Sequence, residues 1–155
     1  MFTAKKTNTR HSLEFKNTVL VATGFDHVWL NTIYEAADVF EENLNLVALS
    51  KDVFLNWRNG SYQSPSFLLS EIIETITPNL LIIPEGRGCF MQLLVDPRVH
   101  CLIARTASQK GRIAMTADAT LALSRLPSRF HISSSQLLFQ RSLVPLEVAK
   151  QLFLS

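Results

Sequence analysis

The sequence predicts an α/β protein with a doubly wound, mostly parallel sheet and helices on both faces, which makes three layers. Short apolar runs rich in β-branched residues alternate with longer segments whose apolar residues recur every three or four positions. The short runs are apolar at nearly every position, as strands covered on both faces are. Because helical segments separate the strands, the connections are long enough for parallel pairing.

The first half of the chain begins with a buried strand followed by an amphipathic helix. The strand covers residues 18–23 and ends at Gly24, and Asp26 is suited to cap the helix that follows. Residues 46–50 form the second strand. The apolar positions of the helix, at spacings of three and four, are Val28, Trp29, Ile33, Ala36, Ala37 and Phe40.

A polar stretch separates the second strand from the next helix. The Asn-Gly pair at residues 59–60 is the clearest turn signal in the chain, and residues 53–55 and 61–63 are suited to be the arms of a small hairpin around it. The spacing of apolar residues predicts a helix over residues 67–77, which ends at Pro78 because proline cannot continue a helix.

The third main strand is the most apolar segment of the chain. It covers residues 79–84 and runs into a glycine-bearing turn at residues 85–88. Residues 89–95 are expected to be helical, and Asp96-Pro97 is suited to start a further helix through residues 98–103.

The last third of the chain repeats the alternation of strand and helix. Residues 112–116 form a fourth strand, and a helix over residues 119–126 follows and stops at Pro127. A fifth strand is expected at residues 130–133 and a closing helix at residues 145–154.

Composition predicts one domain and argues against several partners. The 155 residues suit a basic arm at residues 1–16 and a single α/β domain at residues 17–155. A net charge of +2 is too small to indicate nucleic-acid binding, except through the arm. With 47% hydrophobic and 18% charged residues, the chain is expected to hide some surface in a homodimer.

The remaining compositional signals concern compartment and cofactors. We expect neither a signal peptide nor a membrane span, because no apolar run is long enough. Cys89 and Cys101 do not make a disulfide framework, so a reducing cytoplasm is the expected compartment. His100 and His131 lack neighbours at metal-ligand spacing, and we expect no metal and no cofactor.

Ligands of parallel sheets bind outside the carboxyl ends of the strands, and three segments are expected at that edge. These are residues 24–27, 85–89 and 116–119, which we call the rim. The candidate ligand-binding residues within it are Gly24, Asp26, Glu85, Gly86, Gly88, Thr116, Ala117 and Asp118.

Several rim residues have both a chemical and a purely structural interpretation. Asp26 and Asp118 are suited to be helix N-caps. The turn at residues 85–88 can present backbone N–H groups to an anion or an oxyanion. Cys89 lies where a helix N-terminus would lower its pKa, although buried, inert cysteines are common. Thr116 is a poor nucleophile unless a strong base lies beside it.

The order of these motifs resembles the PfpI and class I glutamine amidotransferase-like superfamily. That superfamily includes the Parkinson-associated deglycase/chaperone family and the ligand-side domain of AraC-type transcriptional regulators. Residues 79–88 (NLLIIPEGRG) resemble its apolar strand ending in Pro-Gly-Gly-x-Gly, and Asp96-Pro97 resembles its Asp-Pro helix start. Residues 110–123 (KGRIAMTADATLAL) resemble G-x-x-A-A-x-C-x-G-x-x-x-L. Residues 18–126 carry the resemblance, which implies a flavodoxin-like, class I glutamine amidotransferase-like fold.

The departures from the superfamily's pattern bear on catalysis. Ala117 stands where the resemblance places the elbow cysteine, and Ala119 stands at the glycine that follows. Glu85 replaces the first glycine of the turn, and Trp29 falls near the position of the family's acid. His131 matches the family's histidine in one alignment, whereas in another its segment is the last strand. Without the thiol, the superfamily's nucleophile is absent.

Three functions remain open from the sequence. The first is a catalytically silent, dimeric binding or regulatory domain for a small ligand or a protein partner, which Ala117 favours. The second is a hydrolase- or glyoxalase-like enzyme with a relocated nucleophile, Cys89 or Thr116, with His131 as a further catalytic candidate. The third is a pseudo-receiver signalling domain, in which residues 99–106 would form a strand and the acidic pocket would be reduced to Asp26.

Overall fold

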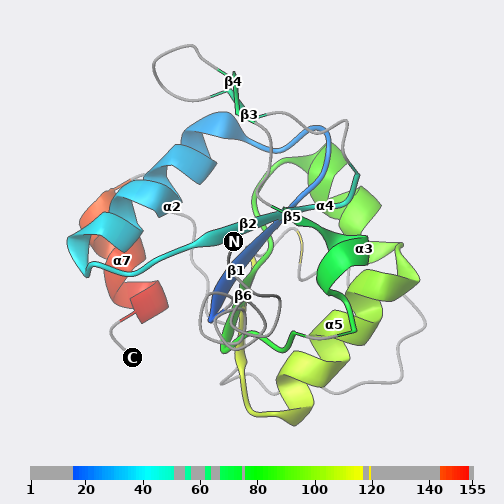
Figure 1. The fold of residues 1–155 in the computed structure, drawn as a ribbon. Helices are drawn as coiled ribbons and strands as arrows, with labels where there is room; N and C mark the ends of the chain where they lie inside the picture. The colour runs from blue at the N-terminus through cyan, green and yellow to red at the C-terminus, as the bar shows by residue number, and fades with distance from the viewer. Residues whose placement is uncertain are drawn as a thin grey trace, which may run out of the picture.

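The chain folds around one parallel sheet, with β1 at its centre. The computed structural model describes residues 16–50, 55–56, 62–63, 67–74, 76–116, 119 and 144–153 (Figure 1). Within these residues every neighbouring pair of strands in the sheet runs parallel. In spatial order the strands are β5 (Phe67–Leu68), β2 (Asn45–Ala48), β1 (Asn17–Val21), β6 (Leu80–Ile82) and β7 (Arg112–Ala114).

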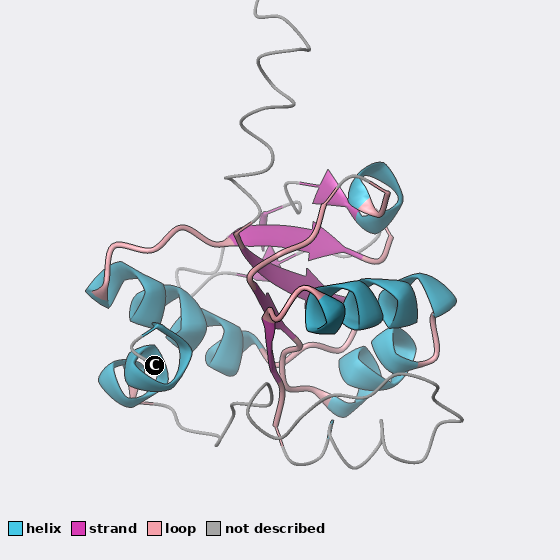
Figure 2. Cartoon of the chain, turned by 90° about the horizontal axis from the view of Figure 1, so that it is seen from below, coloured by secondary structure: helices cyan, strands magenta, loops and turns pink. Residues whose placement is uncertain are grey.

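Helices cover both faces of the sheet, which confirms the three-layer α/β fold. On one face α2 (His27–Val39) packs against α7 (Pro145–Phe153), and Figure 2 shows the two side by side. The other face carries α3 (Leu69–Ile72), α4 (Arg87–Leu94) and α5 (Pro97–Ser108), as Figure 1 shows.

The core lies on both sides of the central strands. All five residues of β1 and all three of β6 are buried, as continuous apolar strands between two helix layers must be. Trp29 of α2 is fully buried in this core, so the residue near the superfamily's acid position serves packing. Because these strands pair in parallel, the carboxyl ends of β1, β6 and β7 lie at one edge of the sheet.

Two predicted helix starts are confirmed by their caps. The Asp26 side chain accepts a hydrogen bond from the Trp29 N–H at 3.1 Å. The Asp96 side chain accepts one from the Arg98 N–H at 2.8 Å, and Pro97 opens α5. Each carboxylate satisfies a backbone donor that has no partner within its own helix.

The predicted helix over residues 67–77 is wrong at its start and in its length. Phe67 and Leu68 form β5 and pair with Val47 and Ala48 of β2, so the helical part is only α3. Pairing wins here because the edge of β2 offers unsatisfied backbone groups that a short strand can bond. The Glu71 side chain then accepts a hydrogen bond from the Leu68 N–H at 2.7 Å, which stabilises the entry into α3.

The helical state of residues 99–106 counts against the pseudo-receiver interpretation. All of them lie within α5, which buries Val99, Leu102 and Ile103, whereas that interpretation needs a strand here. Their spacing of three and four residues gives α5 an apolar stripe toward β6 and β7.

The expected hairpin is confirmed at the residues that the structure describes in this stretch. β3 (Leu55–Asn56) pairs antiparallel with β4 (Tyr62–Gln63). The expected strand at 130–133 and most of the helix over 119–126 lie outside the described residues, as do Ala117, Asp118 and His131. Ala119 itself is helical and buried.

Candidate functional site

The rim begins where the turn after β1 meets the turn after β6. The Asp26 N–H donates a hydrogen bond to the Glu85 carbonyl oxygen at 2.8 Å, which ties the two turns together. Gly86 has a φ of 114°, and a Cβ placed on it would lie 2.3 Å from the Gly24 carbonyl oxygen. Only glycine fits this conformation and this approach of two backbones.

A second pair of glycines brings α4 against the first turn. Gly24 has a φ of 95°, and a Cβ on it would lie 3.2 Å from the Gly88 Cα. The Gln92 side chain of α4 donates to the carbonyl oxygens of Thr23, at 2.8 Å, and Gly88, at 3.0 Å. Gln92 therefore joins α4 to the end of β1, a contact that no local sequence signal indicated.

Cys89 does not have the environment of a nucleophile. Its side chain is fully buried, and its Sγ accepts a hydrogen bond from the Ala22 N–H at 3.3 Å. Burial raises the pKa of the Cys89 thiol to about 12, while that hydrogen bond lowers it by less. Desolvation of the thiolate therefore outweighs any lowering of the pKa by the N-terminus of α4.

Asp26 and His27 have local partners that account for their positions. Asp26 caps α2, which agrees with its structural interpretation as a helix N-cap. The His27 ring packs edge-on against the Phe25 ring, with centroids 4.5 Å apart. Neither contact by itself indicates acid–base chemistry.

Glu85 is the unusual residue of the rim. It is only 8% exposed, and its Oε1 atom is buried without a hydrogen-bond donor among the residues that the structure describes. A buried carboxylate oxygen without a donor carries a desolvation cost and calls for an explanation, such as backbone strain, a catalytic role or a bound water, ion or ligand. The sequence pattern identified Glu85 as a candidate ligand-binding residue and as a replaced glycine, but it did not indicate that the carboxylate would be buried.

Thr116 lies at the same edge of the sheet as Glu85. The strand register pairs Ile82 with Ala114, so residues shortly after β6 and β7 leave neighbouring strands together. Thr116 is 4% exposed. The structure thus brings Gly24, Asp26, Glu85, Gly86, Gly88 and Thr116 to one rim.

The described part of the chain contains neither a cluster of metal-ligating side chains nor a helix that could cross a membrane. No group of three or more His, Cys, Asp or Glu side chains there could hold a metal ion. None of the described helices combines the length and the apolar character needed to cross a bilayer.

Comparison with known proteins finds likeness in structure only. No protein-family model matches the chain, and no curated protein matches its sequence. DJ-1β of Drosophila melanogaster is 14% identical with a TM-score of 0.68, over 88% of this chain and 89% of that chain. A cysteine-to-alanine mutant of a Salmonella typhimurium DJ-1 superfamily protein is 15% identical with a TM-score of 0.66, over 85% and 84%.

Oxidized DJ-1 of Toxoplasma gondii also matches, at 15% identity and a TM-score of 0.59. That match covers 70% of this chain, which spans 58% of the length of that one. Identities this low establish a shared fold and leave the chemistry to be argued from the site. The chain therefore has the fold of the DJ-1/PfpI superfamily, the superfamily that its motifs resemble.

Proposed function

We propose that this chain is a binding or regulatory protein of the DJ-1/PfpI fold that lacks the superfamily's cysteine chemistry. Its rim would hold a small ligand that donates N–H hydrogen bonds to the Glu85 carboxylate. The buried, donor-less Oε1 atom of Glu85 is the observation that carries the proposal.

The position of Glu85 suits this role better than a structural one. Its backbone carbonyl already joins the two rim turns through Asp26, so the fold has no evident need for its carboxylate. A ligand donor would recover the interaction that the buried oxygen lacks among the described residues. Cationic donors should bind best, because hydrogen bonds between charged partners are the strongest.

Two observations weigh against the superfamily's reaction. Ala117 stands at the elbow cysteine in the sequence alignment, and a methyl group cannot attack a substrate. The thiol of Cys89, with its pKa near 12, stays protonated at neutral pH. Thr116 is the alternative nucleophile, and the substitution Thr116→Val described below would test it.

The binding test uses Glu85→Gln, which keeps the side chain's size and removes its charge. Methylguanidinium, methylammonium and acetamide are titrated by calorimetry or NMR, with acetate as the anionic counterpart. We expect the cations to bind wild type, and Glu85→Gln to weaken them at least about tenfold. The exposed Glu74→Gln is the matched control and should bind as wild type does.

A second readout separates ligand binding from a structural role. Relieving a buried carboxylate should raise the stability of the unliganded protein, by about 1 kcal/mol, while binding is lost. The proposal would be overturned if Glu85→Gln lowered the unfolding free energy of the protein, or if it left cation binding unchanged.

The absence of catalysis is tested by esterase, glyoxalase and deglycase assays. We expect no turnover above background. Turnover that Thr116→Val or Cys89→Ala abolishes would instead establish the relocated-nucleophile alternative, and turnover that survives both would refute the silent site outright.

A homodimer and a reducing cytoplasm complete the proposal. The composition, 47% hydrophobic and 18% charged, favours a surface covered by a second copy of the chain. Cys89 and Cys101 are both free thiols, which suits a reducing compartment. Sedimentation equilibrium tests the dimer, and a monomer at micromolar concentration would refute it.

A further inference from the structure

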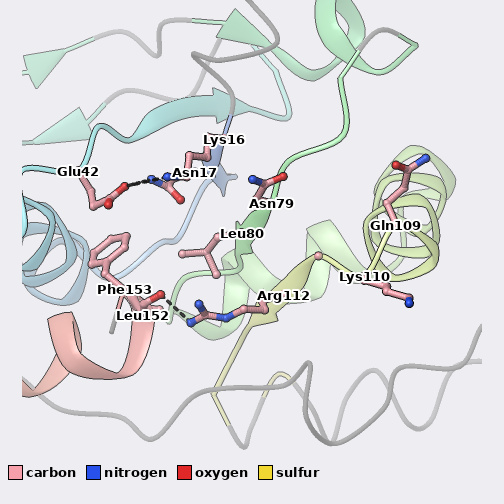
Figure 3. Close-up of a pocket in the computed structure, with 11 residues that line it drawn as sticks. Lys16, Asn17, Glu42, Asn79, Leu80, Gln109, Lys110, Arg112, Leu152 and Phe153 are labelled. Carbon is pink, nitrogen blue, oxygen red and sulfur yellow. Dashed lines mark hydrogen bonds and ion pairs between the residues drawn. The ribbon is translucent and has the colours of Figure 1, made fainter. Parts of the chain in front are cut away.

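A cavity lies at the opposite edge of the sheet from the rim. It has a volume of about 450 Å³, within the range of roughly 300–1,000 Å³ that ligand pockets have. The amino-terminal ends of β1, β6 and β7 form its floor, and the ends of α5 and α7 contribute to its walls (Figure 3).

Hydrogen bonds between distant parts of the chain hold the walls of this cavity. The Arg112 guanidinium donates to the carbonyl oxygens of Gln151, at 3.1 Å, and Leu152, at 2.6 Å. Across the cavity the Asn17 side chain donates to a Glu42 carboxylate oxygen at 2.9 Å (Figure 3). The cavity is thus formed before any ligand binds, which lowers the entropic cost of binding.

The charges around the cavity favour an anion. Three cationic residues, Lys16, Lys110 and Arg112, line it, against the single carboxylate of Glu42, and Figure 3 shows the Lys110 side chain directed away from Arg112. That carboxylate is already engaged by Asn17 and lies 3.8 Å from the Lys16 ammonium. A bound anion would therefore meet a net positive field in a partly enclosed space, where Coulomb attraction is stronger than in bulk water.

The lining also limits the kind of anion. Phe153 is a partly exposed apolar side chain of the lining and suits a hydrocarbon or aromatic body, whereas Leu80 and Leu152 are buried. The N–H groups of Gly111 and Arg112 already donate to the Thr106 and Asn79 carbonyls, so these backbone donors are not available to a phosphate. The C-termini of α5 and α7 add negative potential, which opposes a dianion more strongly than a monoanion.

From this combination we propose that the cavity binds a small organic monocarboxylate whose apolar body rests on Phe153. The site is independent of the rim, because it uses none of the rim residues and lies at the other ends of the same strands.

The test titrates the full chain with phenylacetate and follows binding by calorimetry and by NMR. Phenylacetamide is the neutral counterpart and phenyl phosphate the dianionic one. Lys16→Gln removes one cation from an exposed side chain, so the fold is kept, whereas substitution of Arg112 would also release α7. Arg87→Gln makes the same charge change on an exposed side chain at the start of α4, at the opposite edge of the sheet, and is the matched control.

We expect saturable binding of phenylacetate that weakens with salt and that Lys16→Gln weakens about fivefold. Arg87→Gln and the rim variant Glu85→Gln should leave this affinity within about twofold, since both residues lie at the opposite edge of the sheet from the cavity. No saturable binding, equal binding of phenylacetamide, or equal losses in Lys16→Gln and Arg87→Gln would overturn the proposal. Tighter binding of phenyl phosphate would overturn the monocarboxylate class.

Discussion

Replacing Gly86 by alanine should destabilise the whole rim. The residue has a φ of 114°, and its new Cβ would lie 2.3 Å from the Gly24 carbonyl oxygen and 2.8 Å from both the Asp26 nitrogen and the Phe25 Cα. The unfavourable φ costs about 1–3 kcal/mol, and the overlap with three backbone atoms adds about 1–3 kcal/mol. We therefore expect Gly86→Ala to lose roughly 3 kcal/mol or more of unfolding free energy.

The matched control for this substitution lies two residues further along. A Cβ on Gly88 would meet nothing nearer than 3.7 Å, and Gly88 lies in the first turn of α4. Because alanine favours a helix over glycine, Gly88→Ala should change stability by no more than about 1 kcal/mol, in the stabilising direction.

Urea denaturation followed by circular dichroism measures both changes, with the slope of the transition compared to confirm two-state unfolding. Equal unfolding free energies for the two variants would refute the account of backbone contact between the turns. A loss below about 1 kcal/mol in Gly86→Ala would show that the rim relaxes around the new methyl group.

Three further predictions concern α7, α5 and the buried thiol. Arg112→Gln should remove two hydrogen bonds to the end of α7, cost about 1–3 kcal/mol and speed hydrogen exchange there, whereas substitution of the half-buried Arg98 by glutamine should leave that exchange unchanged. The side-chain hydrogen bond from Arg98 holds the pKa of Asp96 below its usual value, so the stability that Asp96 contributes is present above its unfolded pKa and is lost as pH falls through the folded one. Asp96→Ala should therefore cost about 1 kcal/mol at pH 7 and nearly nothing in strong acid, as denaturation at the two pH values will show. Iodoacetamide at pH 8 should label the exposed Cys101 and spare Cys89 until the protein is denatured, and equal labelling by mass spectrometry would contradict the burial of Cys89.

The fold class and several element starts could be predicted because their signals are local. The apolar run at residues 79–84 contains β6, and the carboxylates of Asp26 and Asp96 mark the starts of two helices. Such signals depend on neighbours a few positions away, so they are present in the chain before it folds. The short strand β5 could not be predicted in this way, because its partner β2 lies about twenty residues earlier in the sequence.

The sequence by itself determined the alternation of strands and helices, the glycines of the rim and the resemblance of its motifs to the superfamily whose fold the chain has. Only the tertiary structure decided which polar groups are buried. The N-terminus of α4 favours a reactive Cys89, but the surrounding core raises its pKa, and Glu85 is a buried carboxylate only because two turns close over the sheet edge. The cavity at the amino ends is likewise a product of folding, since Asn17, Glu42 and Arg112 meet there from distant segments. Burial and charge proximity are properties of three-dimensional packing, and a linear pattern carries them only where the contacting residues are close in sequence.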